Sequence, residues 1–276
     1  MSLQADRRED PCLGVCGRMS LKYMDLWGDI HCRDEEAIAL LKKHEPPEGY
    51  YVAFSGGKDS VVIQDLVERA GVKHDTHFHA TTIDPPEVLH FIREYYPEVI
   101  WERPKNNMYS IIVKRGFPPT RQIRYCCSEL KEIGGHKRTV VLGVRSEESN
   151  SRRQRKEYER STVDKTKWFV NPILTWSTED IWTYIRENQL PYCSLYDNGY
   201  DRIGCILCPV QNLKGRVQDA KRFPKHYNAY LKAFDRMLKR HTDGEKKEYN
   251  WKTAEDVMYW WIYEKNRDTT TVQEEL

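Results

Sequence analysis

A run of six residues combines glycine, serine and lysine in the way that phosphate-binding loops do. It follows an apolar stretch at 50–54 and precedes a stretch at 60–71 whose apolar residues recur with helical spacing. Two adjacent glycines allow tight turns and close approach to a ligand, and the amides at the start of the helix would face an anion. The six residues are Ser55, Gly56, Gly57, Lys58, Asp59 and Ser60.

The side chains of this loop fit the same interpretation. Lys58 adds a positive charge, and Ser55 and Ser60 add hydroxyl donors. The spacing differs from a Walker A loop, which has four residues between its first glycine and the Gly-Lys pair. A glycine-rich turn without a ligand is the alternative, and the strand–loop–helix context disfavours it.

Four of the eight cysteines occur as close pairs, Cys126-Cys127 and Cys205-x-x-Cys208. Four thiolates are the number that a [4Fe–4S] cluster requires, and soft sulfur ligands select Fe–S clusters or zinc over hard cations. A structural zinc site with four cysteines would use the same residues, although adjacent cysteines fit the usual zinc spacing poorly. Uncoordinated core thiols are the third possibility.

The other cysteines carry weaker signals. Cys12, Cys16 and Cys32 show no recognised spacing; with His31 they could form a small zinc site, but a packed or disordered extension is favoured. Cys193 is expected to be a core thiol. Three residues near the first cysteine pair could tune a bound cluster or simply be solvated: Arg124, Lys131 and His136.

Composition restricts the class of protein. The chain has 276 residues, and 44 Lys and Arg against 42 Asp and Glu give a formal net charge of +2. This balance argues against a chain coated with basic residues for duplex nucleic acid. No long apolar run predicts a membrane span, and no apolar segment near the start resembles a secretory signal. We therefore expect a folded cytoplasmic protein with no membrane partner.

Strand and helix patterns alternate over the first two thirds of the chain, which is typical of α/β proteins with a mostly parallel sheet. Beyond residue 177 the pattern becomes helical. Strands are expected at 50–54, 77–83, 139–144 and 168–173. Helices are expected at 34–44, 60–71, 85–96, 178–185, 223–241 and 253–264.

The loop and several later motifs resemble one family. Ser-Gly-Gly-Lys-Asp-Ser is similar to the pyrophosphate (PP) loop of the adenine nucleotide alpha-hydrolase superfamily. Gly143-Val144-Arg145, followed by Ser149 and Arg152, resembles the Gly-Ile-Arg block of the phosphoadenylyl-sulfate (PAPS) and adenylyl-sulfate (APS) reductases. Further motifs follow the reductase pattern: Asn171-Pro172-Ile173, Glu179-Asp180-Ile181-Trp182, Leu190-Pro191-Tyr192 and Ile203-Gly204-Cys205.

The resemblance, which covers roughly residues 48–210, implies a fold and a set of site residues. It implies a Rossmann-like alpha-hydrolase fold with a twisted sheet, divided as an extension at 1–45, a PP-loop domain at 46–215 and a helical extension at 216–276. The whole loop together with Arg145, Ser149 and Arg152 would bind the nucleotide, and Lys58, Asp59 and Arg145 would act in catalysis. Because cluster-bearing reductases carry the same cysteine pairs, the resemblance favours [4Fe–4S] over zinc.

The acidic and basic residues near the loop are compatible with more than one substrate, namely ATP, PAPS or APS. Asp59 and Asp84 could hold Mg²⁺ if ATP is the substrate, whereas PAPS or APS would need no metal there. A basic run at 151–156 could bind the distal phosphate or sulfate of the nucleotide. The alternatives are a solvated loop or a patch that binds RNA or a protein partner. Arg153, Arg155 and Lys156 are therefore left unassigned. His77 and His79 are expected to be core or rim residues.

One feature departs from the reductase pattern. The resembling reductases use a mobile cysteine in a C-terminal Glu-Cys-Gly segment to attack sulfur, and a thiol donor then releases sulfite. No cysteine follows Cys208 in this sequence.

Three hypotheses are compatible with this departure. The first is a PAPS or APS reductase that uses another thiol or a thioredoxin-like donor protein. The second is an ATP-dependent sulfurtransferase that adenylates an acceptor, such as a nucleic-acid base, and releases pyrophosphate. The third is a non-catalytic subunit that binds a nucleotide and a cluster, which the complete loop and cysteine quartet disfavour.

Overall fold

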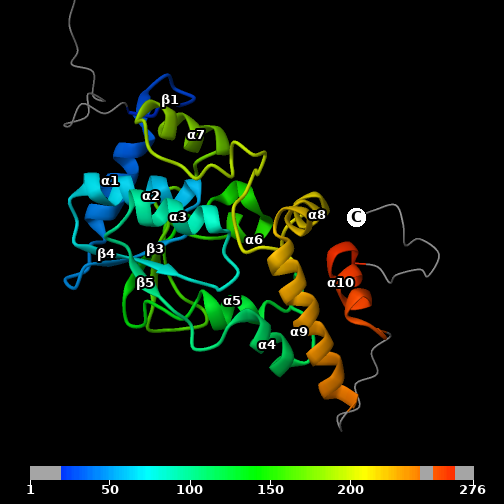
Figure 1. Ribbon diagram of the computed structural model, residues 1–276. Helices are drawn as coiled ribbons and strands as arrows, with labels where there is room; N and C mark the ends of the chain where they lie inside the picture. Colours follow the sequence, from blue (N-terminus) through cyan, green and yellow to red (C-terminus); the bar gives the residue numbers. More distant parts are fainter. Residues whose placement is uncertain (1–19, 243–250, 265–276) are drawn as a thin grey trace, which may run out of the picture. The chain divides into compact units, whose positions relative to one another are not determined.

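The chain folds into two compact units in the computed structural model, which describes residues 20–242 and 251–264 (Figure 1). Unit 1 is built from segments within Met1–His77, Tyr95–Ile100 and Gly135–Cys193. Unit 2 is built from segments within Phe78–Glu94, Trp101–Gly134 and Ser194–Leu276.

Eight strands form two sheets in the described part of the chain. They are β1 (Lys22–Met24), β2 (Ile30–Cys32), β3 (Tyr50–Phe54), β4 (His74–His79), β5 (Ile100–Glu102), β6 (Thr139–Val141), β7 (Tyr158–Arg160) and β8 (Trp168–Val170). β1 and β2 pair as an antiparallel hairpin, and the other six form a sheet of order β5-β4-β3-β6-β8-β7. β3 pairs with β6, and β6 with β8, in parallel, while β7 is antiparallel to β8.

This strand order creates a switch point between β3 and β6. From β3 the chain continues to β4 on one side of this point. From β6 it continues to β7 and β8, which lie on the other side. In open α/β sheets, ligands bind beside the carboxyl ends of the strands at such a point. The phosphate-loop candidate follows β3, so the topology places it at the position where this class of fold binds ligands.

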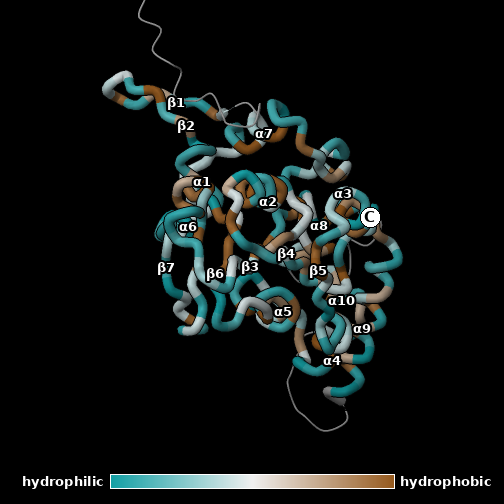
Figure 2. Tube along the Cα trace, turned by 90° about the vertical axis from the view of Figure 1, so that its left-hand side faces the viewer, coloured by the Kyte–Doolittle hydropathy of each residue, from teal (hydrophilic) through white to brown (hydrophobic). Residues whose placement is uncertain are grey.

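Helices follow most of the strands. They are α1 (Arg33–Lys43), α2 (Lys58–Ala70), α3 (Pro86–Tyr95), α4 (Met108–Arg115), α5 (Tyr125–Leu130), α6 (Asn150–Arg153), α7 (Thr178–Glu187), α8 (Leu213–Arg222), α9 (Pro224–Thr242) and α10 (Ala254–Tyr263), with a 3₁₀ turn, η1, at Ser146–Glu148. α1 buries one face, which includes Ala37, Ile38 and Leu41, whereas α2 is buried on nearly all sides and only its Glu68 is exposed. Figure 2 shows the polar and apolar residues of both helices.

The core of unit 1 is continuous from α2 to the neighbouring strands and α7. Ile63 and Leu66 of α2 are fully buried with Val52 of β3 and Tyr184 of α7. The Tyr184 hydroxyl donates to the Asp65 carboxylate at 2.5 Å and accepts from Arg69 at 2.7 Å. This packing holds the helix that follows the loop rigidly against the sheet.

Unit 2 has its own aromatic core. Tyr230 and Phe234 of α9 are fully buried, and the Tyr230 ring lies 4.7 Å from the ring of Trp261 in α10. Tyr109 of α4 packs against the other side of Tyr230 at 5.1 Å. Because α9 contacts both α4 and α10, these three helices form one packed group.

The predicted α/β class, with a mostly parallel sheet and C-terminal helices, is confirmed. The strand expected at 77–83 lies instead at His74–His79, because Asp84 bends the chain after it: its carboxylate accepts the Thr81 N–H at 2.6 Å and the Thr81 hydroxyl at 2.8 Å. The helices expected at 223–241 and 253–264 correspond to α9 and α10. None of the helices in the described residues is long and apolar enough to cross a bilayer.

Candidate functional site

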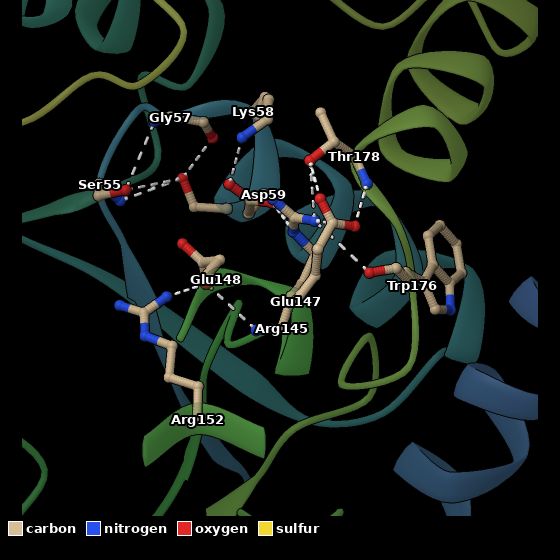
Figure 3. A network of polar contacts seen from close by, with 11 residues as sticks. Ser55, Gly57, Lys58, Asp59, Arg145, Glu147, Glu148, Arg152, Trp176 and Thr178 are labelled. Carbon is tan, nitrogen blue, oxygen red and sulfur yellow. Dashed lines mark hydrogen bonds and ion pairs between the residues drawn. The ribbon is translucent and has the colours of Figure 1, made fainter. Parts of the chain in front are cut away.

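The phosphate-loop candidate is a tight turn held by its own serines (Figure 3). Gly56 adopts φ +70°, which glycine reaches without strain. The buried Ser60 hydroxyl donates to the Gly57 carbonyl at 2.8 Å and accepts the Ser55 N–H at 3.2 Å. The Ser55 hydroxyl in turn accepts the Gly57 N–H at 3.4 Å. In this arrangement the two hydroxyl groups fix the turn.

The carboxylate of Asp59 lies between two cations at the start of α2. Lys58 Nζ donates to one oxygen at 3.0 Å, and Arg145 Nε donates to the other at 2.6 Å. Lys58 is the first residue of α2 and is only 5% exposed. A positive charge is therefore held next to the helix N-terminus, where backbone amides also favour an anion.

Arg145 joins the loop to the segment after β6. Its guanidinium contacts Glu147, donates to the Thr178 hydroxyl at 3.2 Å and reaches the Trp176 carbonyl at 3.5 Å (Figure 3). Its side chain is only 3% exposed. The expected direct contact between Arg145 and a ligand would thus require this network to rearrange.

Glu147 completes the network and was not predicted from the sequence. It accepts the Thr178 N–H at 2.9 Å and the Thr178 hydroxyl at 2.8 Å. These hydrogen bonds, assisted by the charge of Arg145, lower the pKa of the Glu147 carboxyl. A capping box at the start of α7 is visible in the sequence, but Thr178 gives no signal that it would bind a glutamate 31 positions away.

Gly143 allows this assembly to be compact. A Cβ atom at this position would lie 3.2 Å from both the carbonyl carbon and the Cβ of Asp59. Such contacts are tighter than normal packing distances, so a larger residue would push the segment after β6 away from α2. The glycine in the predicted Gly143-Val144-Arg145 motif is explained by this close approach.

Ser149 precedes α6 and Arg152 lies on it, next to the network. The Ser149 hydroxyl caps α6 by accepting the Arg152 N–H at 3.2 Å. The Arg152 guanidinium forms an ion pair with Glu148, and Glu148 also accepts the Arg145 N–H at 3.2 Å (Figure 3). Glu148 therefore links Arg152 to the backbone of Arg145, whose side chain reaches Asp59 of the loop.

The unassigned basic residues differ in environment. Arg155 forms an ion pair with Glu159, and its guanidinium lies 5.2 Å from the centre of the Phe169 ring. Arg155 is therefore directed toward β7 and β8. Arg153 and Lys156 are exposed.

The four paired cysteines converge within unit 2. Cys126 and Cys127 lie on α5, and Cys205 and Cys208 lie on the turn before α8. The Cys126 thiol donates to Cys127, and this bond, burial and the charges of the other three sulfurs raise the pKa of Cys126. All four have free thiols. Proximity of the two pairs was the central expectation from the sequence.

Polar groups surround Cys205. Its thiol donates to the Thr81 hydroxyl at 3.6 Å, and that hydroxyl donates to the buried Asp84. The Lys131 ammonium hydrogen-bonds to Cys205, and a negative charge on this sulfur would raise the pKa of Lys131, whereas burial raises the pKa of the Cys205 thiol itself. Thr81 was not identified from the sequence because it lies 124 positions from Cys205.

The sequence also suggested that His136 could tune a bound cluster and that Asp59 and Asp84 could hold Mg²⁺. His136 does not act on the cysteines in the structure: it hydrogen-bonds to Asp164 at 2.6 Å in unit 1. Asp59 lies in unit 1 and Asp84 in unit 2, and each carboxylate is already hydrogen-bonded within its own unit. In the described residues, no group of three or more His, Cys, Asp or Glu side chains is gathered around a single-ion position.

His77, His79, Cys32 and Cys193 occupy buried or partly buried positions. His77 is 8% exposed and hydrogen-bonds to Asp75, and His79 is partly buried. Cys193 and Cys32 are buried at 1% and 5% exposure. Cys12 and Cys16 lie outside the described residues.

Comparison with known proteins identifies relatives. Residues 49–211 match the sequence model of the phosphoadenosine phosphosulfate reductase domain. An uncharacterised protein of Methanocaldococcus jannaschii is 32% identical over 79% of this chain and 48% of its own length. The adenosine 5'-phosphosulfate reductase of Oceanobacillus iheyensis is 29% identical over 58% of this chain and 70% of its own length.

The similarity covers only part of the curated relatives and is weaker for solved structures. The chain spans about half the length of the first two curated relatives that it matches, 48% and 53%. Among solved structures, the phosphoadenylyl-sulfate reductase of Candida auris shares 20% identity with a TM-score of 0.48, over 62% of this chain and 88% of its own. The sequence match covers more than half of the chain, and it includes the loop and both cysteine pairs: the chain belongs to the phosphoadenosine phosphosulfate reductase domain family.

Proposed function

We propose that the protein is an enzyme that binds an adenylyl nucleotide at Ser55–Ser60 and reduces or transfers sulfur. The observation that carries this proposal is the position of the loop at the sheet's switch point, with Lys58 held beside the N-terminus of α2. Backbone amides, a buried ammonium and a fixed turn are the groups that bind a phosphate or phosphosulfate. A sulfated nucleotide, APS or PAPS, is the preferred substrate class because the family and several relatives are named for it.

We further propose that Cys126, Cys127, Cys205 and Cys208 hold a [4Fe–4S] cluster. The donor set fits this group, because four free thiols converge in unit 2 with a cationic Lys131 next to them. A bound cluster would supply redox chemistry or a concentrated local charge. Among the chain's own residues, Lys131 would offset the negative charge of the Cys205 sulfur, and Thr81, which contacts this sulfur, would help to orient it.

A second candidate function is ATP-dependent sulfur transfer to an acceptor, which would include a nucleic-acid base. The Asp59 carboxylate supports it, since it lies at the phosphate loop and Mg²⁺ is commonly bound by one or two carboxylates together with phosphate oxygens. Mg²⁺ would have to compete with Lys58 and Arg145 for this carboxylate.

The two candidates differ in the nucleotide that should bind. We expect anaerobic calorimetry on cluster-reconstituted protein to show tighter binding of APS or PAPS than of ATP, independent of Mg²⁺. Preference for ATP that requires Mg²⁺ would replace the reductase proposal with the sulfurtransferase. Absence of binding for all three nucleotides would contradict both.

The cluster proposal makes a separate prediction. Replacing Cys205 or Cys126 with serine removes one of four sulfur ligands, so anaerobically prepared variants should lose most bound iron and sulfide and their broad visible absorption. Cys193→Ser is the matched control, because Cys193 is also buried but lies in unit 1, outside the quartet. Unchanged iron and sulfide in both ligand variants would refute the assignment.

A further inference from the structure

A pocket of about 320 Å³ lies in unit 2, outside the phosphate loop and the cysteine quartet. Its walls come from the segment before α5, the residue after Cys208, α8 and the end of α10. Residues on these walls include Pro119, Arg121, Pro209, Arg216, Trp260 and Glu264. The volume is at the lower end of the range for small-molecule sites. We call it the α10 pocket.

The walls of the α10 pocket are fixed by hydrogen bonds. The indole N–H of Trp261, which is only 3% exposed, donates to the Pro119 carbonyl at 2.8 Å. Arg121 donates to the Gln211 carbonyl at 2.6 Å. A site whose walls are already ordered loses little conformational freedom when a ligand binds.

Two guanidinium groups converge on one carboxylate in this pocket. Arg216 Nη1 lies 2.8 Å from Glu264 Oε1, and Arg121 Nε donates to the same oxygen at 3.3 Å. Arg216 is 5% exposed, and its buried Nε has no hydrogen-bond partner among the described residues. Arg216 Nη1 also donates to the Trp261 carbonyl at 3.0 Å. Two guanidinium groups against one carboxylate give the pocket a net positive charge.

Glu264 is placed so that a ligand could displace its carboxylate from Arg121 and Arg216. It follows the last residue of α10, adopts φ +57° and has a side chain that is 53% exposed. Burial opposes its ionisation, but the charges of Arg216 and Arg121 outweigh this and lower the pKa of the carboxyl. Because about half of the Glu264 side chain is exposed, it can turn into solvent and leave its position on Arg121 and Arg216 to a ligand carboxylate.

We propose that the α10 pocket binds a small planar carboxylate, whose anionic group replaces Glu264 on Arg121 and Arg216. Arginine suits this role because its fork of donors matches the two oxygens of a carboxylate. The planar body of the ligand would lie against Trp260 and the two prolines, where aromatic and apolar contacts favour a flat ring. The proposal is independent of the nucleotide and cluster assignments.

The test uses 4-hydroxybenzoate as the probe, with neutral 4-hydroxybenzamide and inorganic phosphate as comparisons. Binding to the full chain is followed by ligand-detected NMR and by the indole N–H resonances of Trp260 and Trp261. We expect saturable binding of the benzoate with a Kd on the order of 1 mM, as is usual for a ligand of this size, and at least roughly tenfold weaker binding of the amide and of phosphate.

Substitutions separate the proposed roles. Glu264→Gln removes the internal competitor, so it should tighten benzoate binding roughly threefold to tenfold, while Arg216→Met should weaken it about tenfold or more. Arg222→Gln is the matched control, since Arg222 is on the same helix but pairs with Glu87. Equal binding of acid and amide, or unchanged affinity in Glu264→Gln, would overturn the proposal even if Arg216→Met fails to fold.

Discussion

A Lys58→Ala variant should lose at least roughly 99% of turnover with the preferred nucleotide and bind that nucleotide about tenfold to 100-fold more weakly. Lys58 presents a buried ammonium at the start of α2, where no other lysine of the loop can replace it. Its removal leaves Asp59 hydrogen-bonded to Arg145, so the fold should persist. Single-turnover kinetics and calorimetry measure the two effects.

The control for this variant is Lys43→Ala at the end of α1, which removes an exposed lysine of the same unit. It should bind and turn over nucleotide like the unmodified protein. Circular dichroism and iron content should be unchanged in both variants. If Lys58→Ala retained normal turnover, the assignment of Ser55–Ser60 as the substrate-binding loop would be wrong.

Arg145→Met should lower the free energy of unfolding by about 3 kcal/mol, because it leaves the carboxylates of Asp59 and Glu147 without their shared partner. The guanidinium is almost completely buried and lies 2.6 Å from Asp59, so water cannot easily replace it. Urea denaturation followed by circular dichroism measures this change. The slope of the free energy of unfolding against urea concentration should be the same in the variant and the unmodified protein.

A second substitution distinguishes loss of charge pairing from loss of packing. In Arg145→Met, Asp59 keeps only Lys58 as a charged partner. Adding Asp59→Asn removes the carboxylate that lost its Arg145 contact, so the double variant should recover part of the lost stability. Arg153→Met, on exposed α6, should change the free energy of unfolding by less than about 0.5 kcal/mol. A double variant no more stable than the single one would show that Arg145 acts by packing alone.

The strand–loop–helix at the phosphate loop could be predicted because its signals are local. Apolar β-branched and aromatic residues, two glycines and a helical period occur within about twenty consecutive positions of the sequence. The role of Arg145 could not be predicted in the same way. The motif identified the residue, but only the fold shows that its guanidinium is buried against Asp59, 86 positions away.

The cysteine quartet was predictable for a similar reason: thiol spacing is visible in the sequence, whereas the groups around the thiols are not. Thr81, which contacts Cys205, lies in the turn after β4, and this turn is held by Asp84 where the sequence pattern had suggested that the strand would continue. Short helices such as α5 were also missed, because six residues that include two cysteines show no helical period.

Each of the two units is built from three segments that are separated in the sequence. The backbone leaves unit 1 after His77, returns briefly at Tyr95–Ile100, and returns again at Gly135–Cys193. Neither unit is a continuous stretch that a gene could gain, lose or exchange as a cassette. The phosphate-loop candidate and the thiol quartet lie in different units that share one interleaved stretch of sequence, so neither unit can be transplanted by a single cut in the coding sequence.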